Sequence, residues 1–387
     1  MRFRHPDGTV VHLAYCTNVH PAEDLDGVLR QIRVFGGGVR AALGADRLGL
    51  GLWLPAPLAR ELAASPTLTD RLRAGLAAAG LETVTLNAFP YTGFHAPVVK
   101  HAVYSPDWTE RARLDYTVDC ARVLARIMPD DAARGSVSTL PLAWREPWDA
   151  DRLATARAHL SELSAVLDGL ADSGRPVRVG LEPEPGCAME TTRDAALLLA
   201  DPPPHVGVCL DTCHLAVGFE EPGAALDRLA AAGLPVVKTQ ASAAVEAPDP
   251  ADPATRAALA AFTEDRFLHQ TRELADGRLR ARDDLPEALA GPRPLDGGGP
   301  WRTHFHAPLH SPAAAPLRGT TDHLDHTLSL LLGPGGARTD HLEVETYTWT
   351  VLPENRRPHG EEGLISGIAA ELAWARDRCT ALGLTPL

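Results

Sequence analysis

The chain has 387 residues, 45% of them hydrophobic, and a formal net charge of -13. This length accommodates two average domains or one large barrel with insertions, while the negative charge disfavours binding to a nucleic-acid backbone, which requires a basic surface. No segment reaches the roughly 18 apolar residues of a membrane span and the first residues contain no apolar signal core, so we expect a cytoplasmic protein without nucleic-acid partners.

Short apolar, β-branched runs alternate with longer stretches of helical spacing. We expect strands at residues 12–20, 48–54, 83–89, 136–143, 177–184, 206–212 and 235–242. We expect helices between them, at about residues 22–42, 56–79, 109–128, 151–172, 191–200 and 223–232. This alternation, with near-continuous apolar strands, indicates a parallel sheet covered on both faces. Seven strand–helix units are more than one half of an open Rossmann sheet usually contains, so an α/β fold of the (β/α)₈ TIM-barrel type fits better.

The alternation is less regular after residue 242. Residues 244–300 are rich in Pro, Gly, Ala and charge, with helix-like stretches at 252–263 and 264–290. We expect them to form an insertion over the barrel mouth, within a single domain spanning residues 1–387. Two further strands at 303–309 and 341–348, separated by a helix at about 319–332, bring the count to nine. Because a barrel needs eight strands, one of the last three must lie outside it, and the pattern does not identify which.

Two consecutive apolar strands each end in carboxylates. Val177-Arg-Val-Gly-Leu-Glu-Pro-Glu-Pro185 carries Glu182 and Glu184, and Val206-Gly-Val-Cys-Leu-Asp-Thr-Cys-His214 carries Asp211 and His214. In a parallel barrel such strand ends meet at the face where active sites lie. A buried carboxylate needs a partner, which a divalent cation or a buried Arg or Lys provides. His214 lies one helical turn past Asp211, where it either touches a substrate or packs against the next helix.

Two later strands carry polar residues at a spacing of two. Glu343 and Glu345 face the same side of one strand, and an inward direction is less costly than burial against helices. His304 and His306 show the same spacing and are consistent either with a metal or polyol site or with a polar core. Carboxylate ligands with one nitrogen or amide suit Mn²⁺, Mg²⁺, Co²⁺ or Zn²⁺.

Other strand ends supply substrate-binding candidates. His20 follows the first strand, Asn87 ends the third, and Lys238 and Gln240 end the seventh. We expect His20, Asn87 and Lys238 to contact a substrate, together with His304 and His306. The run Gly36-Gly-Gly38 lies inside a helical stretch and suits a turn or helix packing better than a phosphate cradle. The six cysteines form no C-x-x-C pair, so we expect buried free thiols.

These motifs resemble those of a known superfamily. The Glu182-Pro pair and Leu210-Asp-Thr-Cys-His214 are similar to strand ends of the xylose-isomerase-like TIM barrel sugar isomerases and epimerases. Within this superfamily, Tyr15-Cys-Thr-Asn-Val-His-Pro21 and Leu342-Glu-Val-Glu-Thr-Tyr-Thr-Trp349 resemble the EboE family, called metabolite traffic proteins. The resemblance covers essentially the whole chain.

The resemblance implies a divalent metal held by Glu182, Asp211 and Glu345 together with a histidine on the seventh strand. It also implies that the two glutamates exchange the proton beside a sugar carbonyl and that the histidine at the position of His214 touches the substrate. The chain departs from this pattern at Gln240, where the superfamily has histidine. Either the Gln240 amide oxygen completes the metal site, or His306 supplies the nitrogen.

We therefore expect a metal-dependent isomerase or epimerase acting on a small polyhydroxylated or sugar-like metabolite, in a biosynthetic or export pathway. A non-catalytic carrier that binds a pathway metabolite on the same barrel is the alternative, because Gln240 weakens the expected metal site. The sequence does not identify the substrate, the metal or the oligomeric state.

Overall fold

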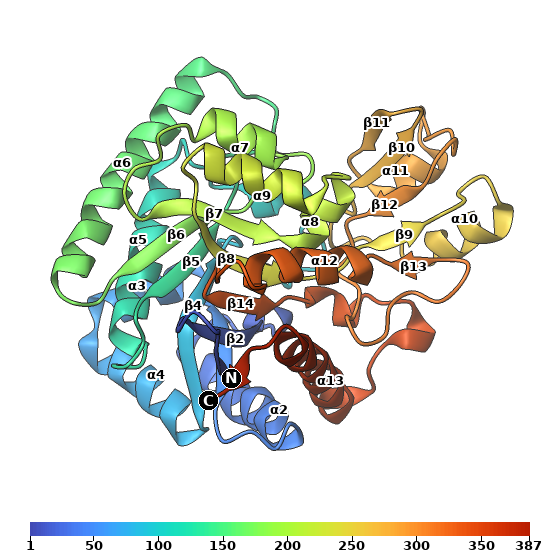
Figure 1. The fold of residues 1–387 in the computed structure, drawn as a ribbon. Helices are drawn as coiled ribbons and strands as arrows, with labels where there is room; N and C mark the ends of the chain where they lie inside the picture. Colours follow the sequence, from blue (N-terminus) through green and yellow to red (C-terminus); the bar gives the residue numbers. More distant parts are fainter.

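Eight parallel strands close into one barrel in the computed structural model, which describes residues 1–387 (Figure 1). The last strand pairs with the first through His341 opposite His12 and Val344 opposite Tyr15, so the sheet has no open edge. The expected (β/α)₈ TIM barrel is confirmed. The barrel strands are β2 (Val10–Cys16), β3 (Leu48–Trp53), β4 (Leu81–Ala88), β5 (Gly135–Thr139), β6 (Val177–Leu181), β7 (Val206–Asp211), β8 (Val236–Ala241) and β14 (His341–Val344).

Helices follow the barrel strands and cover the outside of the barrel (Figure 1). None of them combines the length and the apolar character that crossing a membrane requires. They are α1 (Leu25–Gln31), α2 (Gly37–Ala42), α3 (Ala56–Ala64), α4 (Pro66–Ala78), α5 (Arg111–Ile127), α6 (Ala150–Asp172), α7 (Thr192–Leu198), α8 (Thr212–Val217), α9 (Pro222–Ala231), α12 (Thr321–Leu332) and α13 (Gly360–Ala381).

The helical stretch expected at 22–42 contains a π-helical segment, η2 (Ile32–Gly36), between α1 and α2. The triple glycine in this stretch serves helix packing. A Cβ on Gly36 would lie 2.6 Å from Leu81 Cδ1, and one on Gly38 would lie 2.8 Å from Ile365 Cδ1 of α13. The stretch expected at 56–79 is divided into two helices at Ser65, which caps α4 ahead of Pro66.

A second, five-stranded antiparallel sheet lies between β8 and β14 in the sequence and beside the barrel in space (Figure 1). It extends from residue 245 to residue 319, further than the 244–300 range of the predicted insertion. Its elements are β9 (Val245–Ala247), α10 (Pro253–Ala260), β10 (Thr271–Ala275), β11 (Arg278–Arg282), α11 (Leu285–Ala290), β12 (Trp301–Thr303) and β13 (Arg318–Gly319).

This second sheet corrects two sequence predictions. The stretch at 264–290, expected to be helical, forms the β10–β11 hairpin followed by α11. Asp276 and Gly277 have φ values of 49° and 69°, which are typical of a two-residue hairpin turn that matches strand twist. The strand expected at 303–309 is also wrong, because only β12 forms and it belongs to the second sheet. Of the nine expected strands, the one at 303–309 therefore lies outside the barrel, whereas the one at 341–348 closes it as β14.

The two chain ends meet below the barrel. β1 (Arg2–Arg4) pairs with the start of β2 and with β15 (Thr385–Pro386), and both pairings are antiparallel. The helix α13, which the sequence analysis did not predict, connects β14 to this end and completes the outer layer. All six cysteines are buried and free, as expected.

A buried ion pair fills the barrel interior beneath its mouth. Lys238 Nζ on β8 lies 2.6 Å from Glu343 Oε2 on β14, and neither side chain is accessible to solvent. Lys238 Nζ also donates to Ser138 Oγ at 3.4 Å. Gly51 on β3 provides the space, because a Cβ there would lie 1.2 Å from Glu343 Oε1.

This packing predicts a large effect of Gly51→Ala. The added methyl group displaces Glu343 and separates a buried ion pair, so we expect the free energy of unfolding to fall by about 3 kcal/mol. Urea denaturation at neutral pH measures the change. Gly169→Ala in α6 is the matched control, because its Cβ meets no atom within 4 Å. It is expected to stabilise the helix by up to about 1 kcal/mol. Equal stability of Gly51→Ala and wild type would contradict this account of the interior.

Candidate functional site

Three buried carboxylates meet at the carboxyl ends of the barrel strands. Glu182 follows β6, Asp211 ends β7 and Glu345 follows β14. One oxygen from each lies within 4.8 Å of the others. At an effective dielectric constant of about 20, two unit negative charges at this separation repel by about 3 to 4 kcal/mol. The group therefore needs protons or a cation for its charge to be tolerated.

Asp211 has its position because it ends a strand and begins a helix. It is the N-cap of α8, and its Oδ1 accepts hydrogen bonds from the backbone N–H of His214 at 2.9 Å and from Ser242 Oγ at 2.8 Å. This cap explains the Asp-x-x-His spacing, because the third residue of the helix donates to the capping side chain. His214 is thereby held over the same mouth as Asp211.

Amide groups orient Glu345. Its Oε1 accepts hydrogen bonds from Asn18 Nδ2 at 2.7 Å and from Asn87 Nδ2 at 2.8 Å. Asn18 belongs to η1 (Thr17–Val19) and Asn87 to β4, so residues from opposite parts of the sequence fix one carboxylate. Asn87 thus acts on Glu345 and also lines the pocket where a substrate would lie.

The remaining carboxylate oxygens lack partners. Glu182 Oε2 and Asp211 Oδ2 are buried and accept no hydrogen bond. Burial raises the pKa of Glu182 and of Glu345 well above the usual range, and the neighbouring carboxylates raise both further. Unpaired oxygens with this electrostatic cost are the donor set that a divalent cation satisfies.

Gln240 adds an unsatisfied amide to this group. It is fully buried on β8, in register with Asp211 on one neighbouring strand and Glu343 on the other. Neither its Oε1 nor its Nε2 has a hydrogen-bond partner. A buried amide without partners costs roughly 1 to 3 kcal/mol, so this side chain is poorly explained as a structural residue.

Two predicted substrate-binding residues do not reach the mouth. Lys238 lies in the barrel interior, two residues before Gln240, and its charge is taken up by Glu343. His20 packs outside the barrel, where its ring stacks on Phe35 with centroids 4.3 Å apart and its Nε2 lies 3.2 Å from Tyr15 Oη. We therefore remove Lys238 and His20 from the set of candidate substrate contacts.

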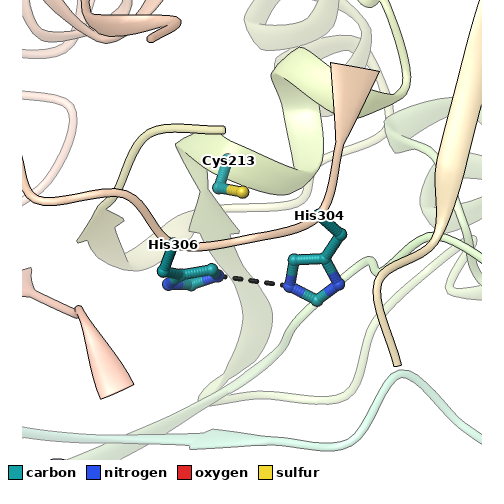
Figure 2. Close-up of side chains that lie close together, drawn as sticks. All are labelled: Cys213, His304 and His306. Carbon is teal, nitrogen blue, oxygen red and sulfur yellow. Dashed lines mark hydrogen bonds between the residues drawn. The ribbon is translucent and has the colours of Figure 1, made fainter. Parts of the chain in front are cut away.

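Three histidines form a cluster beside the carboxylates. His304 and His306 lie on the segment that follows β12, not on a strand as expected, and their rings face each other (Figure 2). The same segment places them beside His214 of α8. His304 Nε2 lies 3.0 Å from His214 Nε2 and 3.2 Å from His306 Nε2. Burial lowers the pKa of all three rings, that of His214 to about 4.

Glu184 links the barrel to the second sheet. Its Oε1 accepts hydrogen bonds from Tyr104 Oη at 2.7 Å and from Gln270 Nε2 at 3.2 Å, whereas its Oε2 has no partner. Gln270 in turn accepts from His304 Nδ1 at 2.7 Å. Burial raises the pKa of Glu184 to about 8, although both hydrogen bonds favour the carboxylate.

One pocket that opens to solvent is lined by Glu182, Glu345, Glu184 and the three histidines, and its empty volume is about 510 Å³ including the opening. Several lining residues were not predicted. Asn18 lies in the same strand-end run as His20, and Glu184 was noted only as a strand-end carboxylate. Tyr104 and Tyr347 lie on short 3₁₀ helices, for which the hydrophobic pattern contained no signal. The polar lining residues are Asn18, Asn87, Lys100, Tyr104, Glu182, Glu184, His214, His304, His306, Glu345 and Tyr347.

Comparisons with known proteins agree with the barrel fold. The family model described as xylose isomerase-like TIM barrel matches residues 40–265. A putative sugar phosphate isomerase/epimerase from Anabaena variabilis ATCC 29413 superposes with a TM-score of 0.52 at 13% identity, over 96% of this chain and 99% of that one. No protein of curated function matches the sequence.

Two further solved structures are similar at lower scores. A xylose isomerase-like TIM barrel protein from Mycobacterium smegmatis, in complex with magnesium, has a TM-score of 0.49 at 14% identity, over 98% of this chain and 94% of that one. The IolI protein with a bound zinc atom has a TM-score of 0.49 at 12% identity, over 96% and 99% of the two chains.

The raised pKa of Glu184 predicts a pH dependence of stability in the chelator-treated protein. The usual pKa of a glutamate side chain is 4.5, and the pKa of Glu184 in the folded protein is about 8. Between these two pH values the folded state holds a proton that the unfolded state has lost. Stability from this group is therefore full below pH 4.5 and is lost as the pH rises to about 8, by at most about 1.4 kcal/mol per pH unit. Glu184→Gln keeps an oxygen that accepts the hydrogen bonds from Tyr104 and Gln270, and it removes the titratable carboxyl group.

Urea denaturation at pH 5, 6.5 and 8 measures this difference. We expect the stability of Glu184→Gln relative to wild type to increase with pH. A difference that is constant across the three pH values would show that Glu184 is ionised in the folded protein.

Proposed function

Because the chain belongs to the xylose isomerase-like TIM barrel family, we propose that it is a divalent-metal-dependent enzyme of the isomerase or epimerase type. The observation that carries this proposal is the group of three buried carboxylates, two of which have an oxygen without a hydrogen-bond partner, together with the unpaired amide of Gln240, which pairs with Asp211 in the barrel sheet. The substrate class we propose is a small polyhydroxylated or sugar-like metabolite. The more specific resemblance to the EboE family stays a prediction.

Four side chains would hold the metal: Glu182, Asp211, Glu345 and, through its amide oxygen, Gln240. An all-oxygen set suits Mg²⁺ or Mn²⁺, and it also accommodates Co²⁺ or Zn²⁺. When bound, such an ion supplies a Lewis acid for a carbonyl oxygen. The fit rests on the buried oxygens that have no other partner.

The protein groups would perform the proton transfer. Glu182 would offer its unpartnered Oε2 to the ion and take a proton from a carbon beside a carbonyl with its second oxygen, Oε1. Glu345 is held by two amides, so its orientation toward the substrate is fixed before binding.

The pocket wall supports the substrate class. His214, Glu184, Tyr104 and Tyr347 present a mixture of donors and acceptors, as several hydroxyl groups require. Aromatic and apolar side chains line the remainder of the wall and exclude water. This combination is typical of small-molecule sites in which a few polar groups fix orientation.

A non-catalytic metabolite-binding protein is the second candidate. The observation that favours it is Gln240, which replaces the histidine of the superfamily pattern and gives a weaker ligand. Tight binding of a polyol without turnover would distinguish this candidate from the enzyme.

The proposal predicts metal-dependent exchange of a carbon-bound proton. The wild-type protein, loaded with Mn²⁺ or Co²⁺ in D₂O, is incubated with a panel of aldoses, ketoses and cyclic polyols. We expect a mass increase of one unit in one substrate, or in its isomer, because the abstracted proton exchanges with solvent. Glu182→Gln and Glu345→Gln are expected to lower this rate at least 100-fold. Exchange that persists in both variants, or absence of exchange and metal in the reconstituted wild type, would contradict the proposal.

If Gln240 is a metal ligand, substitutions at this position should change the metal affinity in a defined order. Gln240→His should raise the affinity for Zn²⁺ or Co²⁺ by about an order of magnitude, because imidazole is the stronger ligand. Gln240→Leu should lower the affinity and also stabilise the metal-free fold, because it removes two unsatisfied buried atoms. Competition with a chromophoric chelator measures affinity, and urea denaturation measures stability. Equal affinity in all three proteins would exclude Gln240 as a ligand.

A further inference from the structure

Glu371 on α13 differs from every other buried carboxylate of the chain. Its side chain is 1% exposed, yet it forms no ion pair and does not line the pocket. The remaining buried carboxylates either belong to the barrel mouth or pair with an Arg or Lys. Those paired with a basic side chain are Glu82, Glu246, Glu273, Asp284, Asp340 and Glu343. A buried carboxylate without a cation is costly, so Glu371 needs a role that an apolar side chain could not fill.

Neutral donors occupy both oxygens of Glu371. Its Oε1 accepts hydrogen bonds from the Leu309 backbone N–H at 3.0 Å and from Thr346 Oγ1 at 2.7 Å. Its Oε2 accepts one from Trp349 Nε1 at 3.2 Å. Only an ionised carboxylate accepts at both oxygens, because a glutamine would present an N–H group to one of these donors. The arrangement therefore requires the charge.

The donors belong to two segments that carry residues of the site. Thr346 directly follows Glu345, and Leu309 lies three residues after His306. The two segments also contact each other, because His306 Nδ1 lies 2.7 Å from Glu345 O and Thr348 Oγ1 donates to His306 O at 2.5 Å. Glu371 thus joins them from behind, on the side away from the pocket.

Pairing in the barrel sheet does not by itself fix the direction of Glu345. The strand β14 ends at Val344, one residue earlier, and the backbone N–H of Glu345 reaches Ala241 O of β8 at 3.3 Å. The chain then turns into the 3₁₀ helix η4 (Tyr347–Thr350). The angle at which Glu345 enters the pocket therefore depends on the contacts that hold the residues after it.

We propose that Glu371 is a positioning residue of the site: its carboxylate joins the segment of Glu345 to the segment of His306 and so sets how both enter the pocket. The importance of Glu345 rests on the proposed function, whereas the link between the segments does not depend on it. Metal sites are tuned in this way by groups behind the ligands.

The charge of Glu371 is not shared with other ionisable groups. The helix α13 packs against α2, β2 and β14, and no ionisable side chain on them forms an ion pair or hydrogen bond with Glu371. Within the two segments, the His310 ring stacks on Trp349 with centroids 6.1 Å apart. The ionisable side chains on these elements are Arg40, His12, Tyr15, Cys16, His341, Glu343, His304, His306, His310, Glu345 and Tyr347 and, on α13 itself, Glu361, Glu362, Arg376, Asp377, Arg378 and Cys379.

Burial raises the pKa of Glu371 to about 7, although its three hydrogen bonds favour the carboxylate. Both oxygens already accept hydrogen bonds, so a proton taken up below this pH displaces one of the donors. The link between the two segments is therefore expected to weaken as the pH falls through about 7.

NMR of the metal-free protein labelled with ¹⁵N-histidine tests the link. The Nδ1–H signal of His306, assigned with His306→Asn, reports its hydrogen bond to Glu345 O. In Glu371→Gln we expect this signal to shift and its exchange with water to become about 10-fold faster, the effect of losing one hydrogen bond to a charged group. Thr346→Val removes only one donor and is expected to act in the same direction. Glu362→Gln, an exposed residue of the same helix, is the matched control and should change nothing.

A double variant separates positioning from packing. Trp349→Phe removes the donor to Oε2, so the amide N–H of Glu371→Gln no longer faces an indole N–H. We expect the double variant to behave like Trp349→Phe alone. Defects that add in the double variant would indicate lost packing and overturn the proposal. An unchanged His306 signal in both Glu371→Gln and Thr346→Val would also overturn it.

Mn²⁺ affinity, measured by electron paramagnetic resonance, connects the link to the proposed metal. Glu371→Gln should weaken binding about 10-fold, and the double variant should match Trp349→Phe. A changed His306 signal in a protein whose wild type binds no Mn²⁺ supports the link and removes the proposed function. Wild-type Mn²⁺ affinity in Glu371→Gln would show that Glu345 is positioned without Glu371, and this result overturns the proposal while leaving the proposed function intact.

The pH profile of the Trp349 indole N–H signal is a readout that a purely structural role would not move. In wild type and in His310→Asn we expect a shift with a midpoint near pH 7. Thr346→Val should raise the midpoint, because it removes a donor that favours the carboxylate. The same shift in Glu371→Gln would arise from another group and would overturn the proposal.

Discussion

The repulsion among Glu182, Asp211 and Glu345 is the constraint on which the mouth of this barrel depends. Three carboxyl groups, with an oxygen of each within 4.8 Å of the others, are each at most 4% exposed, so water screens their charges only weakly. Two amides hold Glu345, and the helix cap holds Asp211. Each of these hydrogen bonds stabilises the group by less than the repulsion between two of its carboxylates costs. Only protonation or a bound cation balances the remainder, and both make the group chemically active.

The surrounding structure is arranged around that charge in layers. Below it, Lys238 neutralises Glu343, and Gly51 leaves room for the pair, so Glu343 adds no net negative charge beneath the mouth. Beside it, the second sheet delivers His304 and His306 to the helix that Asp211 caps. The barrel thus supplies the oxygen donors and His214, and its insertion supplies the other two imidazoles. A long excursion between β8 and β14 is the means by which one fold brings both donor types to one pocket.

Strand ends could be predicted because their signal is local. An apolar run that stops at a carboxylate identified Glu182 and Asp211, and spacing of two indicated that Glu343 and Glu345 share a face. The two-residue alternation of a strand does not encode depth along the barrel axis. The sequence therefore predicts both Lys238 and Gln240 at the mouth, although Lys238 lies in the interior below Gln240. The positions of His304 and His306 depend on the second sheet, whose hairpin at Asp276–Gly277 was mistaken for helix. Tertiary pairing alone brings these rings to His214.

The most direct test of a cation at this site is an anomalous-scattering map of crystals grown without chelator and soaked in Mn²⁺. The account predicts a peak between the carboxylates of Glu182, Asp211 and Glu345, with the Gln240 amide oxygen among the ligands. Absence of any peak, with the carboxylate oxygens still within about 5 Å of one another as protonated groups, would contradict it.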